Sequence, residues 1–126
     1  MAENLRLVCE GSETLYFGSH PPTVKDKVID IEVTDDFIRL ENKLINNDMS
    51  SDEFRKKFGS FTVNNYKKTT DLIEFSEIYS LENNDKSTRT YVGVINRFTA
   101  EITITKHNFL GERIFSGTCK KGERTF

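Results

Sequence analysis

The two cysteines and two histidines of this chain are the residues best suited to covalent or metal chemistry. Cys9 and Cys119 lie near opposite ends of the sequence, and His20 and His107 are the only histidines. A structural zinc site needs four ligands at short paired spacings, and a catalytic thiol needs a cation or a helix N-terminus that lowers its pKa. The sequence offers neither arrangement, so we expect no metal site, no cofactor and no catalytic cysteine.

Two explanations of the cysteine pair stay open. If the first and last strands are neighbours, Cys9 and Cys119 could form a disulfide that closes a loop of almost the whole chain, and that bond would need an oxidising compartment. Otherwise both are small apolar core residues with free thiols. The sequence does not separate the disulfide from the core pair.

The other polar candidates indicate turns and solvated loops. Asp35 and Asp36 are adjacent, so in a strand their carboxylates would point to opposite faces, and a turn suits them better. His20 precedes Pro21, and His107 begins a loop-like segment; neither has a serine or aspartate partner at a recognisable spacing. There is also no glycine-rich phosphate loop and no serine elbow. The sequence therefore favours a protein without enzymatic activity.

One basic group with an aromatic residue is a possible contact surface. It consists of Arg55, Lys56, Lys57, Tyr66, Lys67 and Lys68. Such a group could bind an acidic protein or a single nucleic-acid strand, but it is more typical of a helix that balances its dipole and of charged edge strands. The net charge of −2 provides no overall basic field. We therefore expect a protein partner rather than nucleic acid.

The elements that must position these residues are predicted to be strands. Apolar residues alternate with polar ones in several segments, which is the pattern of half-buried strands. The clearest segments are 5–9, 27–33, 37–40, 71–81, 88–95, 101–105 and 113–119. Turn-forming residues separate them at 18–22, 34–36, 82–85, 96–100 and 107–112. We expect an all-β or β-dominated antiparallel meander of seven or eight strands, in a small barrel or sandwich.

One segment has the features of a helix. Ser51 is a suitable N-cap, Phe54 and Phe58 share a helical face, and Gly59 is a stop signal. We expect a short helix at 51–58 that covers an opening or edge of the sheet. The polar stretch 42–53 is interpreted as a loop inside one domain that spans residues 1–126.

The C-terminal half resembles a hairpin of small bacterial and phage-associated β-domains. The matching elements are GVINRFTAEITIT, FSGTCKKGERTF and, on an early strand, Cys9-Glu10-Gly11. These domains often have I-(N/D)-R-x-T-G-x-(I/L)-x-I followed by F-x-G-x-C and a terminal aromatic residue. The resemblance covers about 50 residues, and the domains have no established chemistry to carry over. This chain has Ala100 where the pattern has glycine, so either the turn differs or Ala100 has a positive φ at a cost of about 1 kcal/mol.

These observations favour a non-enzymatic binding or interaction domain of an accessory, inhibitor or immunity type, with a protein partner. The alternative is a small β-barrel carrier of an apolar small molecule, held by side chains such as Ile73, Phe75 and Ile104. No apolar run is long enough to span a membrane, and the first residues lack a signal peptide. We expect a cytoplasmic protein, or a periplasmic or secreted one if Met1 is not the natural start. A homo-oligomer stays possible.

Overall fold

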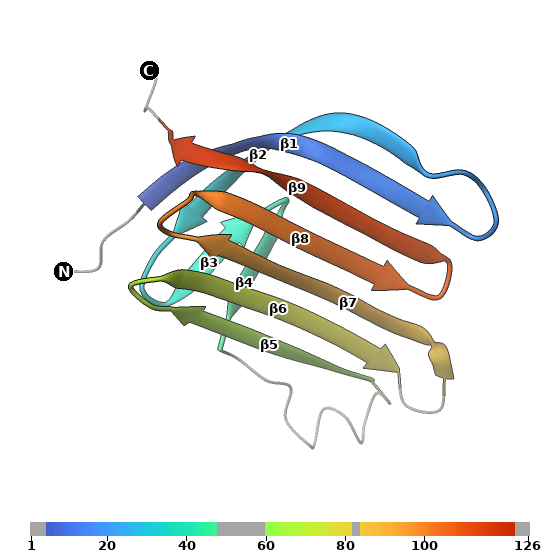
Figure 1. Cartoon of the computed structure of the whole chain (residues 1–126). Coiled ribbons are helices and arrows are strands. Elements are labelled where there is room, and N and C mark those ends of the chain that lie inside the picture. The colour runs from blue at the N-terminus through green and yellow to red at the C-terminus, as the bar shows by residue number, and fades with distance from the viewer. Residues whose placement is uncertain (1–4, 48–59, 82–83, 123–126) are drawn as a thin grey trace.

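The computed structural model describes residues 5–47, 60–81 and 84–122. These residues form nine strands of a single antiparallel sheet (Figure 1). The strands are β1 (Leu5–Phe17), β2 (Thr23–Val33), β3 (Phe37–Leu40), β4 (Lys43–Asn46), β5 (Ser60–Lys68), β6 (Leu72–Leu81), β7 (Asn84–Asn96), β8 (Glu101–Asn108) and β9 (Gly111–Lys121). The prediction of an all-β antiparallel fold is confirmed.

The sheet curls into a nearly closed barrel. Its strand order is β4-β3-β2-β1-β9-β8-β7-β6-β5, and the two edge strands β4 and β5 lie close together (Figure 1). All neighbours are consecutive in the chain except β1 and β9, which pair from Leu7 opposite Lys121 to Phe17 opposite Gly111. The first and last strands are therefore neighbours, but in the middle of the sheet, and the seam of the barrel lies between β4 and β5.

Several predicted elements need correction. The described residues contain no helix, and the helix expected at 51–58 lies outside them. The stretch 42–53 does not begin as a loop, because Lys43–Asn46 forms β4. The strand β5 was also not predicted. Neither strand shows a clear alternation of apolar and polar residues. In KLIN two apolar residues are adjacent, and in Ser60–Lys68 the alternation is weak.

Alternate residues of the strands form one apolar core. It includes Leu7, Cys9, Ile29, Ile31, Val33, Ile38, Leu40, Ile45, Tyr66, Ile73, Phe75, Tyr91, Ile95, Ile102, Ile104, Phe115 and Cys119. The ring of Phe75 fills the place of a missing side chain at Gly93, its cross-strand neighbour, since a Cβ there would lie 2.1 Å from the ring Cζ. Alternation thus produces a packed interior rather than an open channel in this half of the barrel.

Cys9 and Cys119 face each other directly across β1 and β9 and form a disulfide. The backbone N–H of Cys119 donates to the carbonyl of Ala100 on the far side, at 2.7 Å. The cysteines therefore occupy a pair that is not hydrogen-bonded between β1 and β9, where facing side chains come closest. Both are buried, and the bond closes a loop over a sequence separation of 110.

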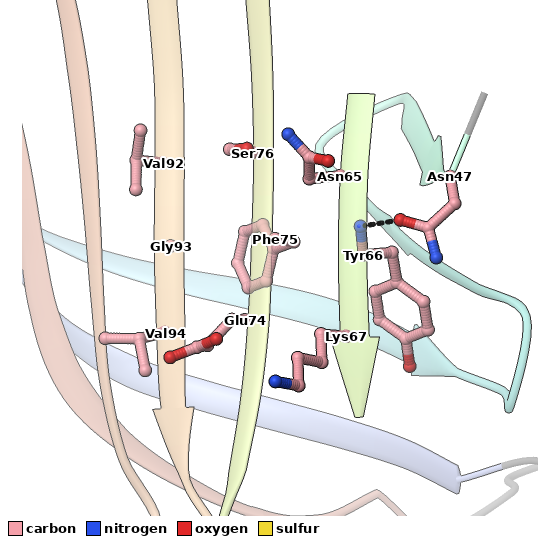
Figure 2. A pocket seen from close by; sticks show the side chains of 10 residues that line it. All are labelled: Asn47, Asn65, Tyr66, Lys67, Glu74, Phe75, Ser76, Val92, Gly93 and Val94. Carbon is pink, nitrogen blue, oxygen red and sulfur yellow. Dashed lines mark hydrogen bonds between the residues drawn. The ribbon is translucent and has the colours of Figure 1, made fainter. Parts of the chain in front are cut away.

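Side-chain contacts hold the seam where no strand ladder forms. The Tyr66 backbone N–H on β5 donates to the side-chain oxygen of Asn47, just after β4, at 2.7 Å (Figure 2). The Tyr66 hydroxyl donates to the Thr34 carbonyl at 2.6 Å, and Lys43 on β4 pairs with Glu77 on β6 at 2.9 Å. The seam is closed by individual polar contacts, which are fewer than a ladder would supply.

Candidate functional site

The inner wall of the barrel carries a row of polar residues near the end where β1 finishes and β9 begins. In the strand registers, each residue of this row is directly opposite the next one on the neighbouring strand, from β5 to β9. The row consists of Asn64, Glu77, Tyr91, Lys106 and Arg113. The next row towards the barrel centre is mainly apolar, with Phe75, Ile104 and Phe115 among its members. We call this end of the barrel the mouth and these five residues the polar row.

The turn between β3 and β4 brings Glu41 to the polar row from the opposite wall. Glu41 and Asn42 have φ of 48° and 64°, as in a two-residue hairpin turn with both central residues left-handed. Asparagine tolerates this geometry, whereas glutamate at such a position costs about 1 kcal/mol. Glycine would adopt this φ without strain, but it would place no carboxylate in the barrel interior, as Glu41 does.

The Glu41 carboxylate joins three strands. It accepts a hydrogen bond from the Tyr91 hydroxyl at 2.6 Å and pairs with the Lys106 ammonium at 2.9 Å. It also pairs closely with Lys27 on β2. This carboxylate therefore links the β2 side of the barrel to β7 and β8 and fixes the position of the β3–β4 hairpin.

Glu13 completes the group, which we call the charge cluster: Glu13, Lys27, Glu41, Tyr91 and Lys106. The Glu13 side chain is only 3% exposed, and it accepts a hydrogen bond from Lys27 at 2.9 Å. Lys106 lies 3.7 Å from the same carboxylate. A carboxylate so buried is stable only with such partners, because burial without them would cost several kcal/mol. The cluster has two anions and two ammonium groups and balances its own charge.

Mutual contacts hold Glu13, Lys27, Glu41 and Tyr91 in their ordinary protonation states. Burial acts to raise the pKa of the Glu41 carboxyl, but hydrogen bonds from Lys27, Tyr91 and Lys106 outweigh it and lower that pKa to about 2. Burial also acts to raise the pKa of the Glu13 carboxyl, but Lys27 and Lys106 outweigh it and lower that pKa. At Lys27 burial is outweighed by the two carboxylates, which raise its pKa. Burial and the bond to Glu41 raise the pKa of Tyr91.

Two hollows flank Lys106 and Asn108 at the mouth. The first, of about 420 Å³, is lined by residues that include Glu77, Tyr79, Arg89 and Tyr91. The second, of about 510 Å³, is lined by Leu15, Phe17, Lys106, Asn108, Leu110, Gly111 and Arg113. We call them the tyrosine hollow and the leucine hollow. Both volumes lie in the range of small-ligand pockets, roughly 300 to 1,000 Å³.

The mouth has more cationic groups than its own carboxylates neutralise. Within the described residues, Lys106 pairs with Glu41 and Glu13, and Lys43 pairs with Glu77. Arg89 lines the tyrosine hollow and Arg113 the leucine hollow, and neither forms an ion pair with any described residue. The mouth therefore has two arginines without a carboxylate partner among the described residues, although the whole chain has a net charge of −2.

A third hollow, of about 560 Å³, lies elsewhere, over β5, β6 and β7 beside the seam (Figure 2). Its charged side chains are Lys67 and Glu74, which are opposite each other in the strand register. The other residues that line it are neutral. The side-chain oxygen of Asn47 already accepts a hydrogen bond from the Tyr66 backbone N–H. Among the described residues, this hollow therefore has no cluster of like charges that would attract a ligand of opposite charge.

The contact surface expected from the sequence is not assembled by the described residues. Arg55, Lys56 and Lys57 lie outside them. Tyr66 is 3% exposed and belongs to the core, so it is not available for contact. Lys68 pairs with Asp35 at 3.0 Å, and Lys67 is exposed. The apolar residues Ile73, Phe75 and Ile104, proposed to line a carrier cavity, are each 2% exposed or less and fill the core.

The remaining sequence candidates occupy separate places. His20 stacks on Phe17 with ring centroids 5.9 Å apart, and His107 is an exposed residue opposite Glu112. Asp35 and Asp36 lie in the turn after β2, where the Thr34 hydroxyl accepts a hydrogen bond from the Asp36 N–H.

Sequence reasoning missed the charge cluster, although a signal for it exists. Glu13, Lys27, Glu77 and Lys106 each interrupt the apolar parity of their own strand. One such interruption is common, but four on strands of the same sheet indicate polar groups inside a barrel. Which of these groups meet becomes clear only when the strand registers are known.

In the described segments, no three His, Cys, Asp or Glu side chains gather as a metal site would require. No helix among them is long and apolar enough to cross a membrane. Comparisons with protein-family models, curated proteins and solved structures found no match to this chain. The resemblance to bacterial and phage-associated β-domains therefore stays a prediction.

Proposed function

We propose that this chain is a non-enzymatic binding domain that acts through contact with an acidic protein partner at the rim of the mouth. The observation that carries the proposal is a group of exposed apolar side chains on two adjacent hairpin tips. Phe17 and Tyr16 end β1, and Phe109 and Leu110 form the turn between β8 and β9. They are 44% to 63% exposed, and Phe17 is opposite Gly111 in the register, so the two tips are neighbours.

Such a surface has the composition of an interaction site. Exposed aromatic residues next to an arginine are typical of the side chains that dominate protein interfaces. Arg113, beside these tips, has no carboxylate partner among the described residues. Charge complementarity therefore favours a partner with acidic residues near an apolar side chain.

The protonation states of the cluster support a role without catalysis. A general acid or base works best when its pKa lies near the working pH. Here the pKa of Glu41 and of Glu13 moves down, and the pKa of Lys27 and of Tyr91 moves up. Every shift leads away from neutrality, so the cluster acts as a fixed set of charges and hydrogen bonds.

The disulfide supports an oxidising compartment for this activity. A disulfide between two buried cysteines persists outside the reducing cytosol. We therefore favour the periplasmic or secreted alternative over the cytoplasm.

The proposal is tested by selecting peptides from a random display library on the immobilised, oxidised protein. We expect the enriched peptides to combine acidic and aromatic residues and to lose at least about tenfold in affinity for a Phe109→Ser, Leu110→Ser double variant. Phe98→Ser is the matched control, because Phe98 is also at a hairpin tip and is 79% exposed, but it lies between β7 and β8 at the other end of the barrel. Peptides that bind all three proteins equally would refute the proposed surface.

A further inference from the structure

We propose that the leucine hollow binds a small amphipathic anion, a carboxylate or phosphate monoester carried on an apolar chain. This inference goes beyond a protein contact, because it assigns a small ligand to a hollow that shares Phe17, Leu110 and Arg113 with the rim. It rests on three features of the hollow: an arginine without a carboxylate partner, a free amide donor and an apolar wall.

The first feature is a pair of cations that face each other. Lys106 on β8 and Arg113 on β9 are directly opposite in the register. Like charges in such a pair repel each other. Lys106 is neutralised by Glu41 at 2.9 Å and lies 3.7 Å from Glu13, but Arg113 has no ion pair with the described residues. An anion in the hollow would supply the charge that this pair lacks, and a guanidinium suits the two oxygens of a carboxylate or phosphate.

The second feature is Asn108, which belongs to the same hollow. Its side-chain oxygen accepts hydrogen bonds from the backbone N–H groups of Leu110 and Gly111, at 2.8 and 3.1 Å. These bonds fix the orientation of the amide, since its oxygen faces the turn. The amide NH2 group is then a donor for a ligand oxygen, with no entropy cost for orienting it.

The third feature is the apolar wall. Leu15, Phe17 and Leu110 are the large apolar side chains that line the hollow. Phe17 and Leu110 are 45% and 54% exposed, so an apolar chain lying on them would remove surface from water at about 25 cal/mol for each Å². The hollow of about 510 Å³ has room for such a chain beside the charged group. A simple inorganic anion would leave this wall exposed.

The experiment measures calorimetric binding of three probes to the oxidised protein: dodecanoate, dodecyl phosphate and 1-dodecanol, each below its aggregation concentration. We expect one or both anions to bind, and 1-dodecanol to bind about tenfold more weakly or not at all. The two anionic probes separate a carboxylate site from a phosphate site. Anion binding should weaken as salt is raised from about 0.05 M to about 0.5 M.

Two variants test the two halves of the site. Arg113→Gln should weaken anion binding about tenfold without affecting 1-dodecanol, and Leu110→Ser should weaken all three probes. Arg39→Gln is the matched control, because Arg39 is an exposed arginine on β3 that is paired with Glu32 at 3.7 Å. Thermal unfolding of each variant checks that it folds.

The inference is overturned if 1-dodecanol binds as tightly as the anions, if Arg39→Gln weakens binding as much as Arg113→Gln, or if no anion binds. These titrations need no protein partner and the peptide selection needs no small molecule, so the two proposals are tested separately although both tests use Leu110→Ser. Anion binding without peptide selection would support this site and count against the proposed protein contact. Peptide selection without anion binding would support the protein contact at the rim and exclude the small-ligand site.

Discussion

Gly11 on β1 and Gly117 on β9 face each other, and each leaves no room for a side chain on the other. A Cβ on Gly11 would lie 2.0 Å from the Ser116 carbonyl oxygen and 2.5 Å from the Gly117 Cα. A Cβ on Gly117 would lie 2.3 Å from the Glu10 carbonyl oxygen. The two strands approach each other closely at this pair. On each strand the glycine is two residues from the disulfide cysteine and on the same face of the sheet. The spacings Cys-x-Gly and Gly-x-Cys are therefore two halves of one structural unit.

Gly11→Ala should destabilise the protein by about 3 kcal/mol, the upper end of the usual cost of over-packing, because backbone atoms of β9 cannot move aside as a flexible side chain would. Gly18→Ala is the control: Gly18 has φ of 57° but nothing within 4 Å of a Cβ, so it should cost only about 1 kcal/mol. The two costs are compared by urea unfolding. Equal costs would show that the close approach of β1 and β9 is not rigid.

Ala100→Gly should leave stability unchanged or raise it by about 1 kcal/mol. Of the two alternatives at Ala100, the structure has the strained turn: φ is 63°, and the Ala100 N–H donates to the Asn96 carbonyl at 2.8 Å. The Asn96 side chain supports the turn by accepting hydrogen bonds from Phe98 and Thr99. Thermal unfolding provides the measurement, and a clear fall in melting temperature would contradict the role of strain at this turn.

Reduction of the Cys9–Cys119 bond should lower the free energy of unfolding by about 4 kcal/mol, because the bond restricts the unfolded chain over a separation of 110 residues. The change is measured as the shift in urea midpoint between oxidised and reduced protein. Cys9→Ala combined with Cys119→Ala should match the reduced protein and be insensitive to reductant. Two free thiols in denatured, unreduced protein would contradict the bond.

Glu41 should make stability depend on pH in the acid range. Its folded pKa of about 2 lies below the ordinary value of 4.5, so its stabilisation is present above pH 4.5 and is lost as the pH falls towards about 2. The loss should be on the order of 2 kcal/mol after allowance for partial exposure. Glu41→Gln should be less stable near neutral pH and show a flatter pH profile in this window.

The control for that experiment is Glu32→Gln. The Glu32 side chain is 42% exposed and only 3.7 Å from Arg39, so its removal should change little at any pH. Urea midpoints measured across the acid range compare the three proteins. An unchanged acid slope in Glu41→Gln would show that the charge cluster does not carry the pH dependence.

Local features of the fold could be predicted from the sequence. The alternation in segments such as 27–33 and 101–105 identifies strands because neighbouring side chains point to opposite faces. The turn at 96–100 follows from Asn96 and Thr99, whose side chains bond nearby backbone groups. These signals involve residues a few positions apart, so no knowledge of the remaining chain is needed.

The weaker strands could not be predicted in the same way. β4 is only four residues long, and it exists because it pairs with β3 and because its Ile45 reaches the core. Its local sequence is as compatible with a loop. A strand that depends on its partner leaves little trace in its own residues.

The sequence by itself determined the alternation of the strands and the turns between them, because these depend on local sterics and hydrogen bonding. Only the tertiary structure decided that β1 and β9 are central neighbours, that Cys9 meets Cys119, and that the seam lies between β4 and β5. The charge cluster was decided in the same way, since Glu13, Glu41 and Lys106 meet only across strands. The physical reason is that strand register and curling depend on packing between distant segments, which no local pattern of residues specifies.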